Sequence, residues 1–267
     1  MSIARINGVE LFYETIGSGP ALLLLHGNGL DHTYLRPWHD ALTDHARVIY
    51  YDQRWNGRSE RRGPTDHATH HADAIALLDH LGEQRATVYG HSYGSWLAQG
   101  LAARHPDRVE RLILCGTSPA FDYVEQAVAT ALARNPDAAA ALISGLAPGA
   151  IAFDGQLAEV WRKILPLYFT GAPRFDVLES VTFSAVGFTR AMEALASFSM
   201  VDALPSLPTP ILALVGHDDY ITPPSQARRL VDLARDAQLV EFAHSGHFPF
   251  VEETSAYLAA IRAWWKR

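Results

Sequence analysis

The chain has 267 residues, of which 48% are hydrophobic and 19% are charged, and its formal net charge at pH 7 is −7. This composition excludes a disordered protein, in which apolar residues are scarce and charges abundant. The acidic balance offers no basic face for nucleic acid. The single cysteine, Cys115, excludes an intramolecular disulfide, and its place at the end of a predicted strand indicates a buried, unreactive thiol.

The N-terminal region shows neither a membrane helix nor an export signal. Its longest apolar run, residues 21–25, is far shorter than the roughly 20 residues that a membrane helix needs. Arg5, Glu10 and Glu14 interrupt the region in which a signal peptide would be apolar. We therefore expect a cytoplasmic protein, monomeric or homodimeric, that acts on a small molecule and binds neither nucleic acid nor membrane.

The first 120 residues alternate between short β-rich runs and longer segments with helical spacing. Asn7-Gly8 separates two β-rich runs, 3–6 and 9–15, and predicts a hairpin at the start of the sheet. Further strands are predicted at 21–25, 48–51, 87–90 and 112–115, and helices at 31–43, 65–81 and 93–105. Strands that alternate with helices indicate βαβ units, and therefore an α/β fold with a mostly parallel central sheet flanked by helices.

The pattern changes between about residues 120 and 203, where alanine-rich amphipathic segments interrupted by prolines replace the strand-like runs. A proline-rich linker at 204–210 follows, and then strands at 211–215 and 239–242 alternate with helices at 223–235 and 252–265. The sequence thus predicts a core formed by residues 1–120 and 204–267. A helical cap, residues 121–203, is inserted after the sixth strand.

A Gly-x-Ser-x-Gly sequence, Gly90 to Gly94, lies between a predicted strand and a predicted helix. In that context it is typical of a nucleophile elbow, a strained turn that lifts the serine hydroxyl above the sheet. Glycine is needed at both ends because strand and helix pass close to each other. The pattern therefore predicts Ser92 as a nucleophile.

A serine hydroxyl needs a base to take its proton, and the base needs a carboxylate to orient it. Among the 13 histidines, His247 follows the last predicted strand and so lies at the same sheet edge as Ser92. We expect His26, His32, His91, His217 and His244, near similar loops, to have packing or hydrogen-bonding roles. Asp218 and Asp219 follow the strand after the cap, and only one of them can face the histidine.

Acyl transfer also needs donors for the tetrahedral oxyanion. We predict the backbone N–H groups of Tyr93, directly after the nucleophile, and of Asn28, in the loop after the third strand. The predicted pocket wall consists of Gly27, Tyr93 and Phe248, which are sequence neighbours of Asn28, Ser92 and His247. The many large apolar residues of the cap favour acyl or alkyl groups over highly charged substrates.

No cofactor or metal is predicted. The first βα unit lacks the Gly-x-Gly-x-x-Gly sequence that binds a nucleotide. His67 and His71 are spaced by one helical turn, but no third ligand accompanies them, so we interpret them as a solvated helix start.

The chain resembles α/β-hydrolase-fold enzymes over nearly its whole length, through the segments LLLLHGNG, YDQRWNGRS, YGHSYG, LALVGHDDYITPP and SGHFPFVEE. In that family the acidic residue stands three positions after the glycine that ends its strand, as Asp219 does after Gly216. The resemblance therefore implies Ser92, Asp219 and His247 as the catalytic triad, with the helical insertion as the lid.

Within the family, DQR followed by GRS resembles proline iminopeptidases. Two departures are the HGNG loop, where those enzymes usually have HGGPG, and the lack of a motif that marks a cap carboxylate for the substrate amine. The candidates, Glu125, Glu159, Glu179 and Glu193, read as solvated helix positions. We therefore expect cleavage of an apolar ester or lactone through an acyl-enzyme on Ser92. The alternatives are release of N-terminal proline from a peptide amide and a hydrolase-fold small-molecule receptor.

Overall fold

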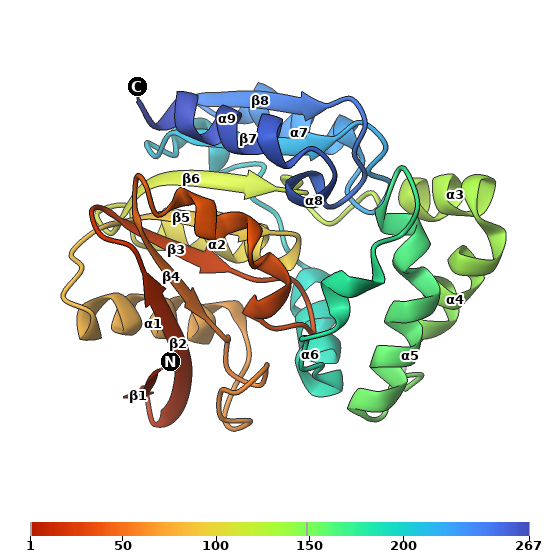
Figure 1. Cartoon of the computed structure of the whole chain (residues 1–267), viewed down its shortest axis with the longest axis horizontal. Coiled ribbons are helices and arrows are strands. Elements are labelled where there is room, and N and C mark those ends of the chain that lie inside the picture. The colour runs from red at the N-terminus through yellow and green to blue at the C-terminus, as the bar shows by residue number, and fades with distance from the viewer. Residues whose placement is uncertain (1, 148, 267) are drawn as a thin grey trace.

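The computed structural model describes residues 2–147 and 149–266, and among them an eight-stranded sheet forms the centre of the molecule (Figure 1). The strand order is β1-β2-β4-β3-β5-β6-β7-β8. The strands are β1 (Ser2–Ile6), β2 (Val9–Ile16), β3 (Ala21–Leu25), β4 (Arg47–Tyr51), β5 (Ala86–His91), β6 (Val109–Cys115), β7 (Ile211–Gly216) and β8 (Ala237–Phe242).

The sheet begins antiparallel and continues parallel. Strand β1 pairs antiparallel with β2 across a turn in which Asn7 and Gly8 have φ of 49° and 80°, so the predicted hairpin is confirmed. Strand β2 is antiparallel to β4, and the pairs from β4 to β8 are parallel. The carboxyl ends of the six parallel strands β4, β3, β5, β6, β7 and β8 therefore meet at one edge, where sites in such sheets are built.

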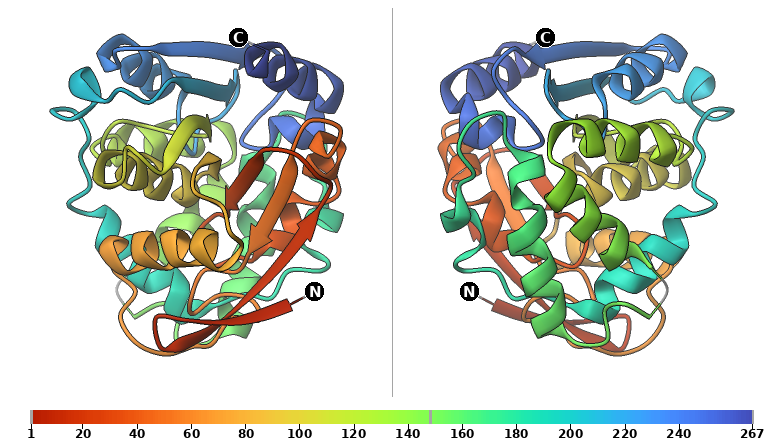
Figure 2. Two further views of the ribbon diagram at one scale, coloured as in Figure 1. Left: turned by 90° about the vertical axis from the view of Figure 1, so that its left-hand side faces the viewer. Right: turned by 90° about the vertical axis from the view of Figure 1, so that its right-hand side faces the viewer.

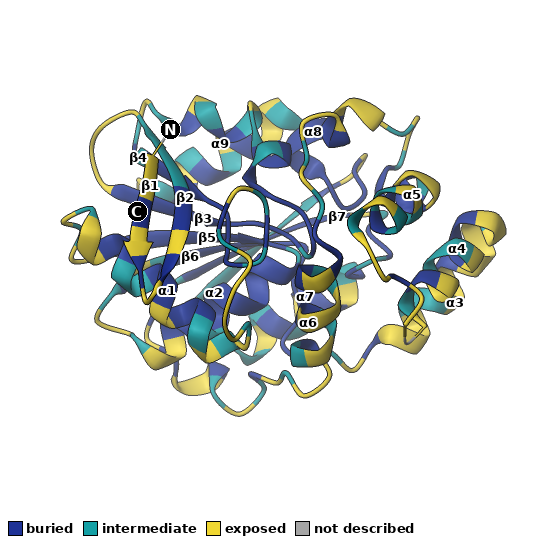
Figure 3. Cartoon of the chain, turned by 90° about the horizontal axis from the view of Figure 1, so that it is seen from below, coloured by how far each residue is buried: buried dark blue, intermediate teal, exposed yellow. Residues whose placement is uncertain are grey.

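Helices cover both faces of the sheet. One face packs against α1 (His67–His80), α2 (Tyr93–Arg104) and α7 (Pro224–Leu233), and the other against α8 (Pro249–Glu252) and α9 (Thr254–Trp265) (Figure 3). Along β3, Leu22 and Leu24 join the hydrophobic cluster on the α9 side, while Leu23 joins the cluster on the α1 side. This double burial explains why the parallel strands read as unbroken apolar runs.

The prediction of one helix over residues 31–43 is wrong. Two short 3₁₀ helices, η1 (His32–Leu35) and η2 (Trp38–Leu42), occupy this region instead. Between them Arg36 is extended, with φ −97° and ψ 151°. Pro37 explains the break, because its ring disfavours helical geometry in the preceding residue and it has no N–H to donate.

A helical segment joins β6 to β7, and we call its residues, 116–210, the helical insert. It contains α3 (Val124–Arg134), α4 (Pro136–Leu146), α5 (Asp154–Ile164), α6 (Ala185–Leu195) and the 3₁₀ helices η3 (Leu165–Tyr168), η4 (Phe175–Leu178) and η5 (Leu204–Ser206). A bridge between Ala120 and Ser199 joins its two ends. In the right-hand view of Figure 2, α4 and α5 lie in front of the sheet edge at which the parallel strands end.

None of the helices in the described part of the chain combines the length and the apolar composition that crossing a membrane requires.

Candidate active site

Ser92 stands at the turn between β5 and α2 in a strained backbone conformation. Its backbone φ of 53° and ψ of −120° lie in a region that residues other than glycine rarely adopt. Such a conformation costs about 1–3 kcal/mol. The turn is held by hydrogen bonds from Ser92 N to the Cys115 carbonyl (2.9 Å) and from Ser95 N to the Ser92 carbonyl (2.8 Å). A glycine is required nearby, since a Cβ on Gly94 would lie 2.0 Å from the Leu25 carbonyl oxygen. The geometry expected of the elbow is therefore present.

The structure brings His247 and Asp219 together. His247 lies in the loop between β8 and α8, and its Nδ1 is 2.8 Å from Oδ2 of Asp219. Both side chains are buried, with 1% and 2% exposure. Asp219 also accepts hydrogen bonds from the backbone N–H groups of Ile221 (2.9 Å) and Thr222 (2.8 Å) and from the Thr222 hydroxyl (2.8 Å). These donors fix the carboxylate toward the histidine.

Asp218 faces the other way. Its side chain is partly exposed, and its Oδ1 lies 3.6 Å from the guanidinium of Arg134 on α3. The sequence alone left the choice between Asp218 and Asp219 open, and the resemblance favoured Asp219. The geometry agrees, because of these two aspartates only Asp219 has a hydrogen bond to His247.

The hydrogen bonds determine the tautomer of His247. A carboxylate only accepts, so Nδ1 carries the proton that is donated to Asp219. The other nitrogen, Nε2, is buried and has no hydrogen-bond partner among the described residues. Ser92 and His247 line the same cavity. His247 thus has a free proton-accepting nitrogen and lines the same cavity as Ser92.

A buried Tyr34–His91 pair, which no motif revealed, connects the site's loops. A carbonyl oxygen only accepts, so His91 donates from Nε2 to the His247 carbonyl (3.0 Å). Nδ1 of the neutral ring then accepts the proton of the Tyr34 hydroxyl (2.8 Å), which itself accepts a hydrogen bond from Gly27 N (2.7 Å). Burial, and then the charge of His247, lower the pKa of His91 well below its usual value, so His91 stays neutral. His91 is buried as predicted, and it also links Tyr34 to the backbone of His247.

The loop after β3 and the start of α2 border the same cavity. Gly27, Asn28, Tyr93 and Phe248 all line it. The Gly27 N–H is already bound to Tyr34, whereas Tyr93 is the first residue of α2, where a helix leaves the backbone N–H without an internal acceptor. The N–H of Asn28 is next along the loop.

The cavity has a volume of about 120 Å³ and an apolar wall. At about 10–15 Å³ per water-sized space, it can hold a small organic molecule. None of its lining residues is Asp, Glu, Lys or Arg, although several come from the helical insert; these include Leu142, Leu146, Leu157, Val160, Trp161, Phe188 and Met192. Glu125, Glu159, Glu179 and Glu193 are all exposed and lie outside the lining, as their reading as solvated positions predicts.

The interpretation of His67 and His71 as a solvated helix start is wrong for His71. Helix α1 does begin at His67, which is half-buried. His71 is only 3% exposed and its neighbour His70 only 5%. Helix α1 packs on α2, where Gly100 leaves room for the His71 ring: a Cβ there would lie 2.7 Å from the ring carbon Cε1. The helical spacing alone did not reveal which face of α1 meets α2.

We expect the buried histidines His39, His70 and His71 to make the protein acid-labile. Burial lowers the pKa of His39 to about 4 and the pKa values of His70 and His71 to about 3. The unfolded chain therefore binds more protons below about pH 6.5, so stability is complete above that pH and is lost as pH falls. Each of these three groups contributes a slope of about 1 kcal/mol per pH unit between pH 6 and 5.

Urea unfolding at pH 7, 6 and 5 measures this slope. His70→Gln should reduce the slope by about 1 kcal/mol per pH unit, whereas His244→Gln, at an exposed position, should leave it unchanged. A slope that His70→Gln does not alter would show that burial of this imidazole is not a cause of the acid lability.

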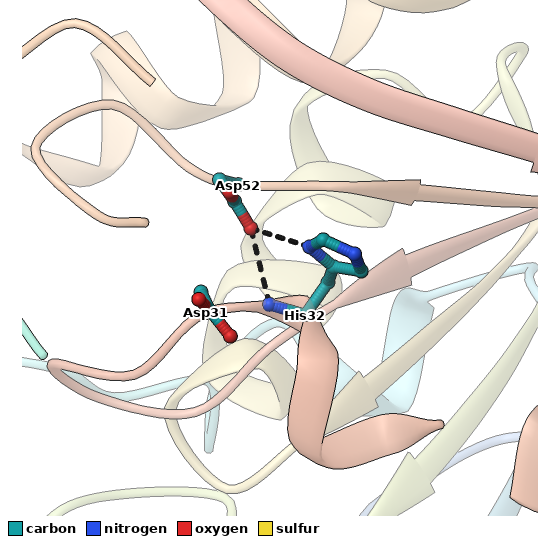
Figure 4. Close-up of side chains that lie close together, drawn as sticks. All are labelled: Asp31, His32 and Asp52. Atoms are coloured by element: carbon teal, nitrogen blue, oxygen red, sulfur yellow. Dashed lines mark hydrogen bonds and ion pairs between the residues drawn. The ribbon is translucent and has the colours of Figure 1, made fainter. Parts of the chain in front are cut away.

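Asp31, His32 and Asp52 form the one group of closely spaced potential metal ligands in the described part of the chain (Figure 4). Their ligand atoms already have partners. Asp52 Oδ1 accepts from His32 N (3.1 Å) and Nδ1 (2.7 Å), and Asp52 Oδ2 from Arg58 N (2.9 Å). Asp31 accepts from Thr33 N (2.9 Å) and Thr182 N (2.9 Å). The cluster therefore works as a hydrogen-bonded support for the loop after β3.

Comparison with known proteins places the chain in a family. A family model of the alpha/beta hydrolase fold matches residues 20–254. Pimeloyl-[acyl-carrier protein] methyl ester esterase from Chromobacterium violaceum is 31% identical over 261 residues, covering 95% of this chain and 97% of the esterase. Proline iminopeptidase PfmaB from Pestalotiopsis fici is 25% identical over 276 aligned positions, covering 98% of each chain. The solved structure of an enol-lactonase from Burkholderia xenovorans LB400 has a TM-score of 0.75, with 27% identity and full coverage of both chains. The expected family is thereby confirmed: the chain belongs to the alpha/beta hydrolase fold family.

Proposed function

We propose that this protein is a serine hydrolase that cleaves uncharged carboxylic esters or lactones through an acyl-enzyme on Ser92. The observation that carries the proposal is His247, which bonds to Asp219 through Nδ1, has an unpartnered Nε2 and lines the same cavity as Ser92. That is the arrangement by which a base activates a serine hydroxyl.

In this mechanism Ser92 Oγ attacks the substrate carbonyl carbon while His247 Nε2 accepts its proton. Asp219 keeps the imidazole in the required tautomer and stabilises its protonated form. The backbone N–H groups of Asn28 and Tyr93 hold the oxyanion, strengthened by the positive end of α2. His247 then delivers the proton to the leaving alcohol, and water activated by the same base releases the acid.

The cavity wall supports an uncharged substrate. Burying an ionised group without a partner costs several kcal/mol or more, and the lining offers no Lys, Arg, Asp or Glu side chain. We propose that the helical insert acts as a cap over Ser92, with residues 121–203 as its extent. Relatives named for ester and lactone cleavage agree with this class.

The same wall disfavours release of N-terminal proline, which requires a partner for a charged amine. The four candidate glutamates lie on the exposed surface of the insert rather than in the cavity. The relative that is a proline iminopeptidase therefore indicates shared ancestry more than a shared substrate.

A substrate panel tests the proposal. Wild-type protein is offered p-nitrophenyl butyrate, γ-butyrolactone and proline p-nitroanilide at pH 7.5. We expect turnover of the ester, the lactone or both, with at least about a hundredfold lower kcat/KM for the proline amide. Faster proline release would contradict the proposal in favour of an aminopeptidase, and no turnover of any compound would favour a small-molecule receptor.

A further inference from the structure

We propose that Asp31 is a positioning residue that couples the cap to the oxyanion-binding loop, here defined as residues 26–31. The inference rests on the proposed role of the Asn28 N–H. It assigns to the helical insert a part in assembling the catalytic site, in addition to covering the cavity.

The first half of the oxyanion-binding loop is held by the core. The His26 carbonyl accepts a hydrogen bond from Gln53 Nε2 (3.1 Å), and Gly27 N donates to Tyr34 (2.7 Å). The residue after the loop is held as well, since His32 bonds to Asp52 through both its backbone N–H and its ring (Figure 4). Asp31 is 1% exposed and its Oδ1 accepts from Thr33 N, so the carboxylate has a fixed orientation.

The second half of the loop is held by the insert. Asp31 Oδ2 accepts a hydrogen bond from Thr182 N (2.9 Å), and the Gly29 carbonyl accepts one from Ser184 N (2.9 Å). Thr182 and Ser184 are two residues apart in the segment that leads into α6. Asn28 therefore lies between a half of the loop fixed by the core and a half fixed by the insert.

This placement makes the Asn28 N–H depend on the contact between Asp31 and the insert. An oxyanion donor is effective only within about 2.7–3.1 Å of the developing negative charge. A displacement of about 1 Å can cost a hundredfold in rate. Because the oxyanion exists in the transition state and not in the bound ester, misplacing the donor should lower kcat and leave KM nearly unchanged.

Asp154 provides a matched control. It is also an aspartate that anchors the insert: its Oδ1 accepts a hydrogen bond from Ala185 N (2.8 Å), and its Oδ2 pairs with Arg61 (2.6 Å). It binds the same segment of the insert three residues after Thr182, but it has no hydrogen bond to residues 26–31 among the described residues. Its removal therefore reports the effect of loosening the insert alone.

The test compares Asp31→Ala, Asp31→Asn and Asp154→Ala with wild type on p-nitrophenyl butyrate, with butylboronic acid as a tetrahedral inhibitor. We expect Asp31→Ala to lower kcat at least about tenfold with KM within about twofold. The inhibition constant of the boronic acid should rise in proportion to the loss of kcat. Asp31→Asn keeps one acceptor oxygen and should retain an intermediate kcat, and Asp154→Ala should keep kcat within about twofold.

Three outcomes would overturn the inference while ester hydrolysis by wild type stands. They are an unchanged kcat in both Asp31 variants, an equal loss of kcat in Asp154→Ala, and an effect of the Asp31 variants on KM alone. If Asp31→Ala does not fold, the Asp31→Asn variant decides by the same criteria. A wild-type protein without ester turnover would instead overturn the proposed function itself.

Discussion

Replacing Ser92 with alanine should lower kcat for p-nitrophenyl butyrate by on the order of 10⁴–10⁶-fold, because the acyl-enzyme can no longer form. What activity remains would come from the oxyanion donors and from binding alone. The measurement is the steady-state rate of p-nitrophenol release at saturating ester, with wild type assayed in parallel.

Ser255→Ala is the matched control, since this serine is exposed on α9, away from the cavity lining. It should retain wild-type kcat. Near-full activity in Ser92→Ala would remove the nucleophile from the mechanism, whereas equal loss in both variants would point to damaged folding.

The Asp219→Asn variant should lose about 10³–10⁴-fold in kcat, since an amide nitrogen in place of Oδ2 donates to His247 rather than accepting from it. The imidazole would then carry its proton on Nε2, where Ser92 needs a base. Asp218→Asn should change kcat by less than about twofold, because Asp218 pairs with Arg134 at a partly exposed position.

The two aspartates are adjacent and of the same type, so the comparison separates position from charge. Equal losses in the two variants would contradict the separate roles. A larger loss in Asp218→Asn would transfer the role of orienting the base from Asp219 to Asp218.

Features that depend on local sequence could be predicted from the sequence by itself. The Asn7-Gly8 hairpin follows from turn chemistry, and the buried strands follow from unbroken apolar runs. The strained turn at Ser92 follows from two glycines between a strand and a helix. His247 could be selected from 13 histidines because parallel strands end at one edge of the sheet.

Contacts between distant segments were decided only by the tertiary structure. Neighbouring residues such as Asp218 and Asp219 look alike in sequence, and only packing shows which carboxylate reaches His247. The burial of His70 depends on the docking of α1 against α2, and the role of Tyr34 depends on Gly27 and His91 meeting at one hydroxyl.

The wall of the cavity was likewise beyond sequence reasoning, because an amphipathic helix pattern shows that a face is apolar without showing what that face covers. The insert could be recognised as helical from its composition, yet only the tertiary structure shows that its glutamates are exposed and that several of its apolar residues line the same cavity as Ser92. The hydrogen bond from Thr182 to Asp31 joins residues 151 positions apart. No local pattern encodes such a contact, since it exists only once the insert and the sheet have packed together.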